Sequence, residues 1–356
     1  MTNRNARGYT VSNKRKGETA LKKSERLLAE KFLLQRIYDE DKDFVERTME
    51  EFGVSKSTVY NYLTALQESG EVERVGGSMP YRVIYKTTRV TIDPTREHSE
   101  DRLFARDVAP LLADLPANLQ KIWRYAVTAM LNNALEHSRA TAIVCVVHRN
   151  RLNTIVGILD NGTGIFRRIQ QDVREREGET ITAAEAAGLL YAGGYSGTPE
   201  THAGQGIFFV SRLMDHFAIR SEQQLFTLNG EEEESADRFR GTAVQMALAN
   251  DSARELSAVM ARYIDPEEGF IRTEIPVARF FGGAFPVSRS EARRLGAVLA
   301  GFREAELNFA DVDEVGPDFA HELFTVFAGQ TPTLRLTVTG ASESLARALR
   351  RAGYRG

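Results

Sequence analysis

The sequence has almost none of the features that mark disulfide-bonded, membrane-spanning or P-loop proteins. Cys145 is its single cysteine, so a disulfide within the chain is excluded. The thiol lies in the apolar run AIVCVV, which predicts a buried core residue and not a reactive group. No apolar run approaches the roughly 20 residues that a membrane-spanning helix needs, and no secretory leader begins the chain. No G-x-x-x-x-G-K-[ST] string occurs, which excludes a P-loop. We therefore expect a soluble, cytoplasmic protein.

The chain is long enough for several domains, and its charge is unevenly distributed. Its 356 residues, 42% of them apolar, predict two or three domains with sizeable cores. The formal net charge is −3, but the N-terminus is basic. Within residues 4–23 Glu18 is the acid, and the cations are Arg4, Arg7, Lys14, Arg15, Lys16, Lys22 and Lys23. Such a segment is typical of a solvated arm, so we expect residues 1–20 to form a basic, disordered arm that can contact nucleic acid.

Residues 21–88 show three helical patterns followed by a hairpin pattern. The stretch ALKKSERLLAEKFLLQRIYDE has helical periodicity, and DKDFVERTMEEFG predicts a second helix that ends at Gly53. In VSKSTVYNYLTALQESG, Ser55 is the expected N-cap of a third helix and Gly70 its stop. The alternating segment EVERVGGSMPYRVIYK predicts a hairpin with Gly76 and Gly77 at its turn.

This order of helix, turn, helix and hairpin resembles a winged helix-turn-helix, which implies DNA binding by the third helix. The residues placed to reach DNA are Lys56, Ser57, Tyr60 and Asn61 at the start of that helix, and Arg74 and Arg82 beside the wing. Small modules of this outline also mediate protein contacts, and that alternative stays open. The adjoining basic arm favours DNA, because electrostatics supply most non-specific affinity.

Residues 89–255 carry four short polar motifs along an α/β pattern. The first, AVTAMLNNALEHS, belongs to a helix expected over 119–138, whose apolar stripe is interrupted by Asn132 and Asn133. Two strands, ATAIVCVVHR and LNTIVGIL, follow, and the motif DNGTGI then begins at Asp160. In HAGQGIFFVSRLMDHF two glycines precede an amphipathic helix, where backbone N–H groups and the helix dipole can face phosphates. A last strand, RGTAVQMAL, carries Thr242 near its start. Alone, DNGTGI indicates only a capped turn.

Together these motifs resemble the N, G1, G2 and late-threonine boxes of the GHKL ATPases, the superfamily of gyrase B, heat-shock chaperones, mismatch-repair ATPases and histidine kinases. The resemblance implies a Bergerat-type α/β sandwich that binds ATP and Mg²⁺. It assigns Asn133 to the metal that bridges the phosphates, Asp160 to the adenine amino group, and Thr242 to the same network. The glycines that it assigns are Gly162 and Gly164 beside the base, and Gly204 and Gly206 beside the phosphates.

The resemblance also implies a lid over the nucleotide, formed by residues 166–203. The glycines of its segment YAGGYSGTPETHAG fit a hinge, because glycine tolerates unusual backbone angles. The lid residues so assigned are Gly193, Gly194, Ser196, Gly197 and Thr198. In this superfamily a closed lid favours pairing of two ATP domains, so a homodimer favoured by ATP is expected.

One position departs from the resemblance. Hydrolytic members carry a glutamate four residues before the metal-binding asparagine, where it activates water as a general base. Here that position is Ala129, whose methyl group cannot accept a proton. Two explanations stay open: the protein binds ATP without hydrolysing it, or the alanine replaces a native glutamate and traps bound ATP. The nearest acid, Glu136, and its neighbour His137 are expected on a solvated helix edge.

Residues 265–356 alternate between helical and strand patterns. EAELNFADV and LRLTVTG predict buried parallel strands. The pattern, carried by SRSEARRL and NFADVDEVGPDFAHELFTVF, resembles the small STAS-like domains fused behind GHKL modules, and implies a protein partner. STAS is the fold of anti-sigma-factor antagonists, which carry a phosphorylated serine where this sequence has Gly316-Pro317-Asp318. A phosphoserine switch is therefore not expected, and Pro317 and Asp318 predict an ordinary N-terminal turn and cap.

Three functions are compatible with these features of an α/β multidomain chain. The first is an ATP-dependent switch that changes how the winged helix meets DNA and how the STAS-like domain meets a protein. The second is a protein kinase, either an anti-sigma-type serine kinase or, less consistent with the sequence, a histidine kinase. His98 in TREHSEDRLF is followed by Ser99, so its neighbours do not form the usual His-Glu or His-Asp start of a phospho-accepting motif. The third is a scaffold that holds ATP without catalysis.

Overall fold

The computed structural model describes residues 23–77, 79–193, 203–229, 239–283 and 285–356. They form two compact units: residues 23–85 with 150–152, and residues 86–149 with 153–356. The expected basic arm lies outside the described residues. The described chain contains no helix that is long and apolar enough to cross a membrane.

The first unit contains the three helices and the hairpin that the sequence predicts. Its elements are α1 (Lys23–Tyr38), α2 (Phe44–Phe52), α3 (Lys56–Glu68), β1 (Val72–Arg74) and β2 (Tyr81–Val83). Gly53 ends α2 in the left-handed conformation with φ +63°, and the Ser55 hydroxyl accepts a hydrogen bond from the Thr58 N–H at the start of α3. Both signals act as expected, because a left-handed residue stops a helix and a hydroxyl satisfies a free N–H group.

The second unit is built on a six-stranded antiparallel sheet with the order β3-β4-β5-β8-β6-β7. The strands are β3 (Lys86–Ile92), β4 (Ile143–Arg149), β5 (Asn153–Asp160), β6 (His216–Glu222), β7 (Gln224–Asn229) and β8 (Phe239–Ala249). Along β5 the buried positions alternate and end at Asp160. This alternation is typical of an antiparallel sheet with one covered face, and it places the Asp160 carboxylate on that face.

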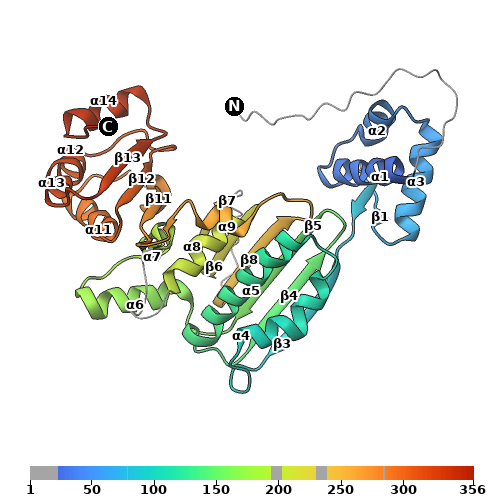
Figure 1. The fold of residues 1–356 in the computed structure, drawn as a ribbon, viewed down its shortest axis with the longest axis horizontal. Helices are drawn as coiled ribbons and strands as arrows, with labels where there is room; N and C mark the ends of the chain where they lie inside the picture. The colour runs from blue at the N-terminus through green and yellow to red at the C-terminus, as the bar shows by residue number, and fades with distance from the viewer. Residues whose placement is uncertain (1–22, 78, 194–202, 230–238, 284) are drawn as a thin grey trace. The chain divides into compact units, whose positions relative to one another are not determined.

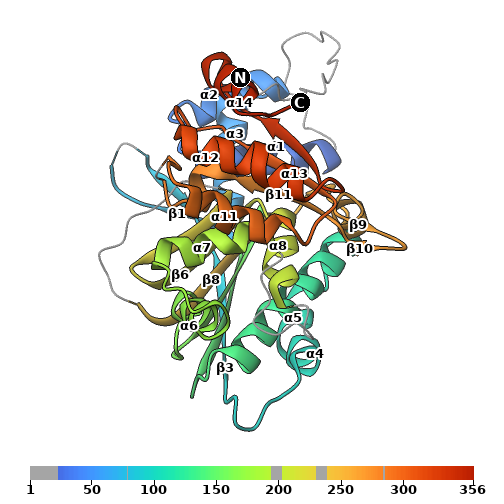
Figure 2. The same ribbon diagram turned by 90° about the vertical axis from the view of Figure 1, so that its left-hand side faces the viewer.

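Helices cover that face of the sheet. They are α4 (Glu100–Leu103), α5 (Ala117–His137), α6 (Ile165–Glu177), α7 (Ala183–Ala192), α8 (Ala203–Leu213) and α9 (Leu256–Met260). A π-helical turn over Phe104–Val108 and a 3-10 turn over Ala109–Leu112 join α4 to α5. Figure 1 shows α5 and α8 side by side across the strands, and Figure 2 shows α4 and α5 to one side of β3 and β8. Cys145 on β4 is buried in this core, as expected, and burial raises the pKa of its thiol to about 12.

A second, smaller sheet follows in the same unit. The strands β11 (Arg272–Pro276), β12 (Glu304–Asn308) and β13 (Arg335–Thr339) are parallel, as the sequence predicts for the last two. The expected burial is wrong for β13, which lies at the edge of this sheet and has no buried residue. The helices around them are α10 (Val277–Phe280), α11 (Arg289–Leu299), α12 (Pro317–His321), α13 (Ala328–Gln330) and α14 (Glu343–Arg351), with a π-helical segment over Glu322–Phe327 (Figure 1). A short ladder of β9 (Ile264–Asp265) and β10 (Gly269–Phe270) precedes them. One continuous hydrophobic core includes buried residues from both sheets.

Candidate functional site

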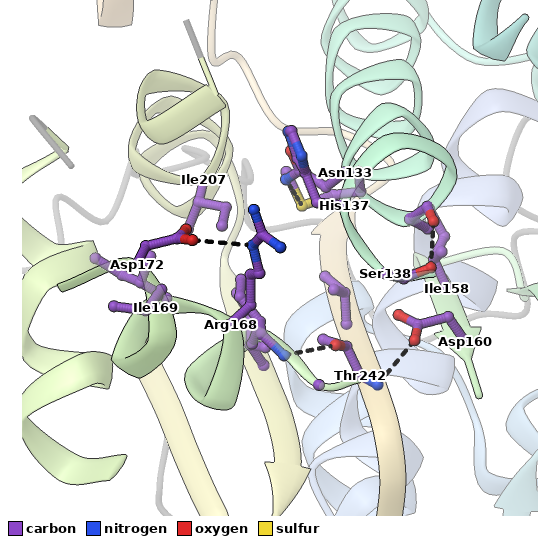
Figure 3. Close-up of a pocket in the computed structure, with 17 residues that line it drawn as sticks. Asn133, His137, Ser138, Ile158, Asp160, Arg168, Ile169, Asp172, Ile207 and Thr242 are labelled. Atoms are coloured by element: carbon purple, nitrogen blue, oxygen red, sulfur yellow. Dashed lines mark hydrogen bonds and ion pairs between the residues drawn. The ribbon is translucent and has the colours of Figure 1, made fainter. Parts of the chain in front are cut away.

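A pocket with a cavity volume of about 120 Å³, open to solvent, lies between the helices and the end of β5. Figure 3 shows Asn133 and His137 on α5, with Ser138 directly after it, on one side of the pocket, and Arg168, Ile169 and Asp172 on α6 on the other. Asp160 and Thr242 lie at the ends of β5 and β8. The pocket thus gathers Asn133, Asp160, Gly164 and Thr242 from three motifs that are far apart in the sequence.

Asp160 and Thr242 form the polar end of the pocket. They are paired in the β5–β8 register, and the backbone N–H groups of Gly162 and Thr242 donate to the Asp160 Oδ1 at 2.8 and 3.3 Å. The Thr242 hydroxyl accepts from the Ile165 N–H at 3.1 Å. Burial raises the pKa of Asp160, and these hydrogen bonds offset part of that effect. The Thr242 side chain also acts on the carboxylate as a hydrogen-bond partner, and Oδ2 has no backbone donor among the described residues.

Three glycines hold the backbone close around this carboxylate. A Cβ on Gly162 would clash with the Ser138 carbonyl, and one on Gly241 would clash with the Asp160 carbonyl. Gly164 has φ +89°, and its Cβ would clash with the Ser221 hydroxyl. Gly162 and Gly164 are expected to leave room for the base. The structure shows that both positions also lack space for a side chain, because neighbouring atoms lie too close.

The amide of Asn133 lines the pocket one helical turn after Ala129. Its Nδ2 contacts the Met130 sulfur at 4.0 Å, and no donor among the described residues reaches its Oδ1. An amide oxygen is a hard ligand of the kind that Mg²⁺ takes. No group of three or more His, Cys, Asp or Glu residues within the described ranges could hold a metal. A metal at Asn133 would therefore need oxygens from a bound phosphate and from water to complete its shell.

The glycine-rich segments differ from expectation in their boundaries. Helix α8 begins at Ala203, so Gly204 and Gly206 lie in its first turn and not ahead of it. Helices α6 and α7 occupy much of 166–203, because Gly164 and the Thr182–Glu185 capping box start them. Gly193 ends α7 with φ +72°. The remaining lid assignments, Gly194, Ser196, Gly197 and Thr198, lie outside the described residues.

Sequence reasoning missed the polar residues that α6 contributes. Arg168 and Asp172 face the pocket and form an ion pair, with 3.1 Å between the Arg168 Nε and the Asp172 Oδ1. The signal was present, because Ile165, Arg168, Ile169 and Asp172 have the i, i+3, i+4, i+7 spacing of one helix face. His137 was also missed, since it lines the pocket instead of lying on a solvated edge.

The side chains expected to meet DNA all belong to the first unit, and some of them are paired with neighbouring side chains. Tyr60 and Asn61 on α3 are exposed, and Ser57 is in contact with Ser55. Lys56 forms an ion pair with Glu46 at 3.4 Å, and Arg82 pairs with Glu73 across the hairpin. Arg74 is exposed, and no acid within the described chain pairs with it.

At the start of α12 the structure corrects one detail of the sequence interpretation. Gly316 is the N-cap residue, Pro317 is the first helical residue, and Asp318 makes no capping hydrogen bond. Asp318 instead pairs with Arg289 at 3.2 Å. A Cβ on Gly316 would clash with the Val287 carbonyl, so a serine does not fit this position.

Comparison with known proteins identifies only the C-terminal part of the chain. Residues 293–346 match the family model of the STAS-like domain of unknown function (DUF4325). The match runs from α11 to α14 and confirms the STAS-like assignment of this region. No curated protein matches the chain.

Proposed function

We propose that this protein is an ATP-binding regulatory switch of the GHKL type, coupled to a DNA-binding winged helix and to its STAS-like domain. The observation that carries the proposal is the Asp160 site: a buried carboxylate at a strand end, held through Oδ1 by two backbone N–H groups. The Oδ2 oxygen, which has no backbone donor among the described residues, would accept a hydrogen bond from an exocyclic amino group such as that of adenine. Ile158 and Ile165 line the same pocket and would form an apolar surface against the adenine ring.

The opposite part of the pocket suits the phosphates. Asn133 offers its amide oxygen to a magnesium ion, and α8 brings the N–H groups of its first turn and the positive end of its dipole. Magnesium would supply charge neutralisation between phosphate oxygens. The residues present therefore fit Mg-ATP with the base at Asp160.

The state of the nucleotide can reach the STAS-like domain through two direct contacts. The proposed lid, residues 166–203, includes α7, and both α7 and α8 are hydrogen-bonded to β11. The Thr273 hydroxyl donates to the Ala192 carbonyl at 2.8 Å, and the Arg212 Nη2 donates to the Glu274 carbonyl at 2.9 Å. Movement of either helix on lid closure would act on adjacent residues of the first strand.

Helix α7 also packs tightly against the elements that follow β11. A Cβ on Gly188 would clash with the Phe280 carbonyl, and Glu185 forms an ion pair with Arg294 of α11 at 2.6 Å. Leu190 of the same helix lines the nucleotide pocket. One helix thus has the pocket on one side and the STAS-like region on the other, which supports the proposed coupling.

The proposal is tested by calorimetry with Mg-ATP on the wild-type chain and on Asp160→Asn. Losing one charge-assisted hydrogen bond weakens binding about ten- to a hundredfold. Asp114→Asn is the matched control, because this exposed carboxylate pairs with Arg149 outside the pocket. Equal ATP affinity in all three proteins removes the adenine role of Asp160, and no binding by the wild type removes the function. Transfer of γ-phosphate to a protein substrate would instead identify a kinase.

A further inference from the structure

The α6 wall of the pocket carries a charged pair that the four motifs leave without a role. Arg168 and Asp172 lie one turn apart and are joined through the Arg168 Nε at 3.1 Å. The Asp172 side chain is 8% exposed, whereas that of Arg168 is 35% exposed. The carboxylate is therefore fixed in the wall, while the guanidinium remains accessible from the pocket.

The pair uses only part of the guanidinium. An arginine offers five N–H donors in a planar fork, and the Asp172 carboxylate lies against Nε, at the stem of that fork. The two terminal nitrogens have no partner among the described residues. A fork with both ends free, held at its stem by a buried acid, suits planar recognition of an oxyanion such as phosphate.

Charge points to the same ligand. Among the described residues that line the pocket, Arg168 is the one that always carries a positive charge, and the acids in the lining are Asp160 and Asp172. ATP would bring several negative charges into this space. In Figure 3 the guanidinium extends towards the side of the pocket where Asn133 and His137 lie, and Asp160 is at the opposite end. Arg168 is thus placed near the phosphates and not near the base.

We propose that Arg168 binds the phosphate chain of the nucleotide through its terminal nitrogens, with Asp172 as the residue that positions it. This assignment rests on the proposed function, because it needs the base at Asp160. It makes Arg168 a selectivity determinant: the pocket distinguishes nucleotides from nucleosides by this contact.

The experiment compares ATP, ADP and adenosine, each with Mg²⁺, by calorimetry on the full chain. Arg168→Gln should weaken ATP binding about ten- to a hundredfold, since a charge-assisted bond is removed, and leave adenosine affinity unchanged. The matched control is Arg167→Gln, one residue earlier on α6, where the side chain pairs with Glu222 and does not line the pocket. Thermal unfolding with and without adenosine confirms that each variant is folded.

The outcomes separate this inference from the function on which it rests. If the wild type binds ATP and Arg168→Gln binds it equally well, the phosphate role is wrong and the ATP site remains. Equal losses for ATP and adenosine would show that Arg168 supports the pocket without reading phosphate, which also overturns the proposal. A wild type that binds none of the three ligands overturns both.

Discussion

Ala129 on α5 faces Gly206 on α8, and a Cβ built on Gly206 would lie 3.5 Å from the Ala129 Cβ. The residue at position 129 thus sits beside the first turn of α8, to which the proposed function assigns the phosphates. It also lies one turn before Asn133, on the helix edge that borders the pocket. A longer side chain at position 129 would extend between these two phosphate-side elements.

Ala129→Glu is therefore expected to give the protein ATPase activity. A positioned general base contributes about 10²–10⁴-fold to a rate, so phosphate release at saturating ATP should rise by that order. Thr128→Glu is the control, because its side chain starts about 100° away around the helix. Equal phosphate release from the alanine and glutamate proteins would contradict the general-base assignment.

The same pair of proteins tests assembly. A ligand that binds a paired state preferentially shifts the equilibrium towards it. Because the alanine form cannot leave the ATP-bound state by hydrolysis, we expect it to accumulate as an ATP-bound homodimer in light scattering. A monomer at every ATP concentration would remove pairing from the mechanism and leave the hydrolysis prediction intact.

Asp160 should link ATP binding to pH and to stability in opposite directions. Burial raises the pKa of Asp160 in the folded protein, so the folded state holds this proton more tightly than the unfolded chain. The free energy of unfolding therefore decreases as pH rises from the pKa of an aspartate in the unfolded chain, about 3.9, through the higher pKa of Asp160 in the folded protein. At neutral pH, Asp160→Asn should raise the melting temperature of the nucleotide-free protein while it weakens ATP binding.

On acidification, ATP affinity of the wild type should fall as Asp160 takes up its proton, because a protonated acid is a poorer acceptor for the adenine amino group. Fluorescence titrations of a nucleotide at several pH values check this, with Asp160→Asn as the variant that lacks the group. An identical pH profile in both proteins would assign the titration to another residue.

The sequence predicted several elements of both units because each depends on local signals. The alternation of β5, the turn after it and the caps of α2 and α3 follow from neighbouring residues. The parallel pairing of β12 and β13 is as expected, but their continuous burial is not: β12 alternates between buried and half-buried residues, and β13 has no buried residue.

Contacts between residues that are distant in the chain could not be predicted from the sequence. Nothing in the pattern near Thr273 indicates that its hydroxyl meets the carbonyl of Ala192, 81 positions earlier. The pairing of Arg168 with Asp172 is local, but only the packing of α6 shows that it faces the pocket.

Gly162→Ala tests the close approach beside the carboxylate. The new methyl would clash with the Ser138 carbonyl, which is backbone and cannot move aside cheaply. Overpacking of this kind costs about 1–3 kcal/mol, and we expect that loss in chemical denaturation, together with loss of ATP binding. Gly157→Ala on the same β5 strand is the control, because its nearest neighbour would be the Leu159 Cδ1 at 3.6 Å. Equal stability of the two variants would argue against tight packing at Gly162.

Arg74→Ala should weaken DNA binding and reduce its salt dependence. Arg74 is exposed beside the wing with no acid paired to it in the described chain, so it is free to meet a phosphate. Removing one cation that neutralises a DNA phosphate lowers the slope of log affinity against log salt by about one unit. Arg47→Ala on α2, whose cation pairs with Asp41 at 3.0 Å, should leave the slope unchanged. Anisotropy titrations that show no DNA binding at any salt would instead favour a protein-binding role for this unit.

Thr273→Val tests whether the STAS-like region and the nucleotide pocket are coupled. The change removes the hydrogen bond to the Ala192 carbonyl and keeps the side-chain shape. The end of α7, which belongs to the proposed lid, is therefore held less firmly. ATP affinity should fall several-fold, within the typical 5–150-fold range of allosteric coupling, because ordering the loosened segment costs more on binding. Thr339→Val is the control, because the hydroxyl of Thr339 on β13 donates to the Glu306 carboxylate on β12 at 2.7 Å, away from α7. Both variants should lose about 0.5–1.5 kcal/mol of stability, so thermal unfolding alone does not separate them. Only a fall in ATP affinity confined to Thr273→Val supports coupling through β11, and equal affinities would leave the two sheets as neighbours without communication.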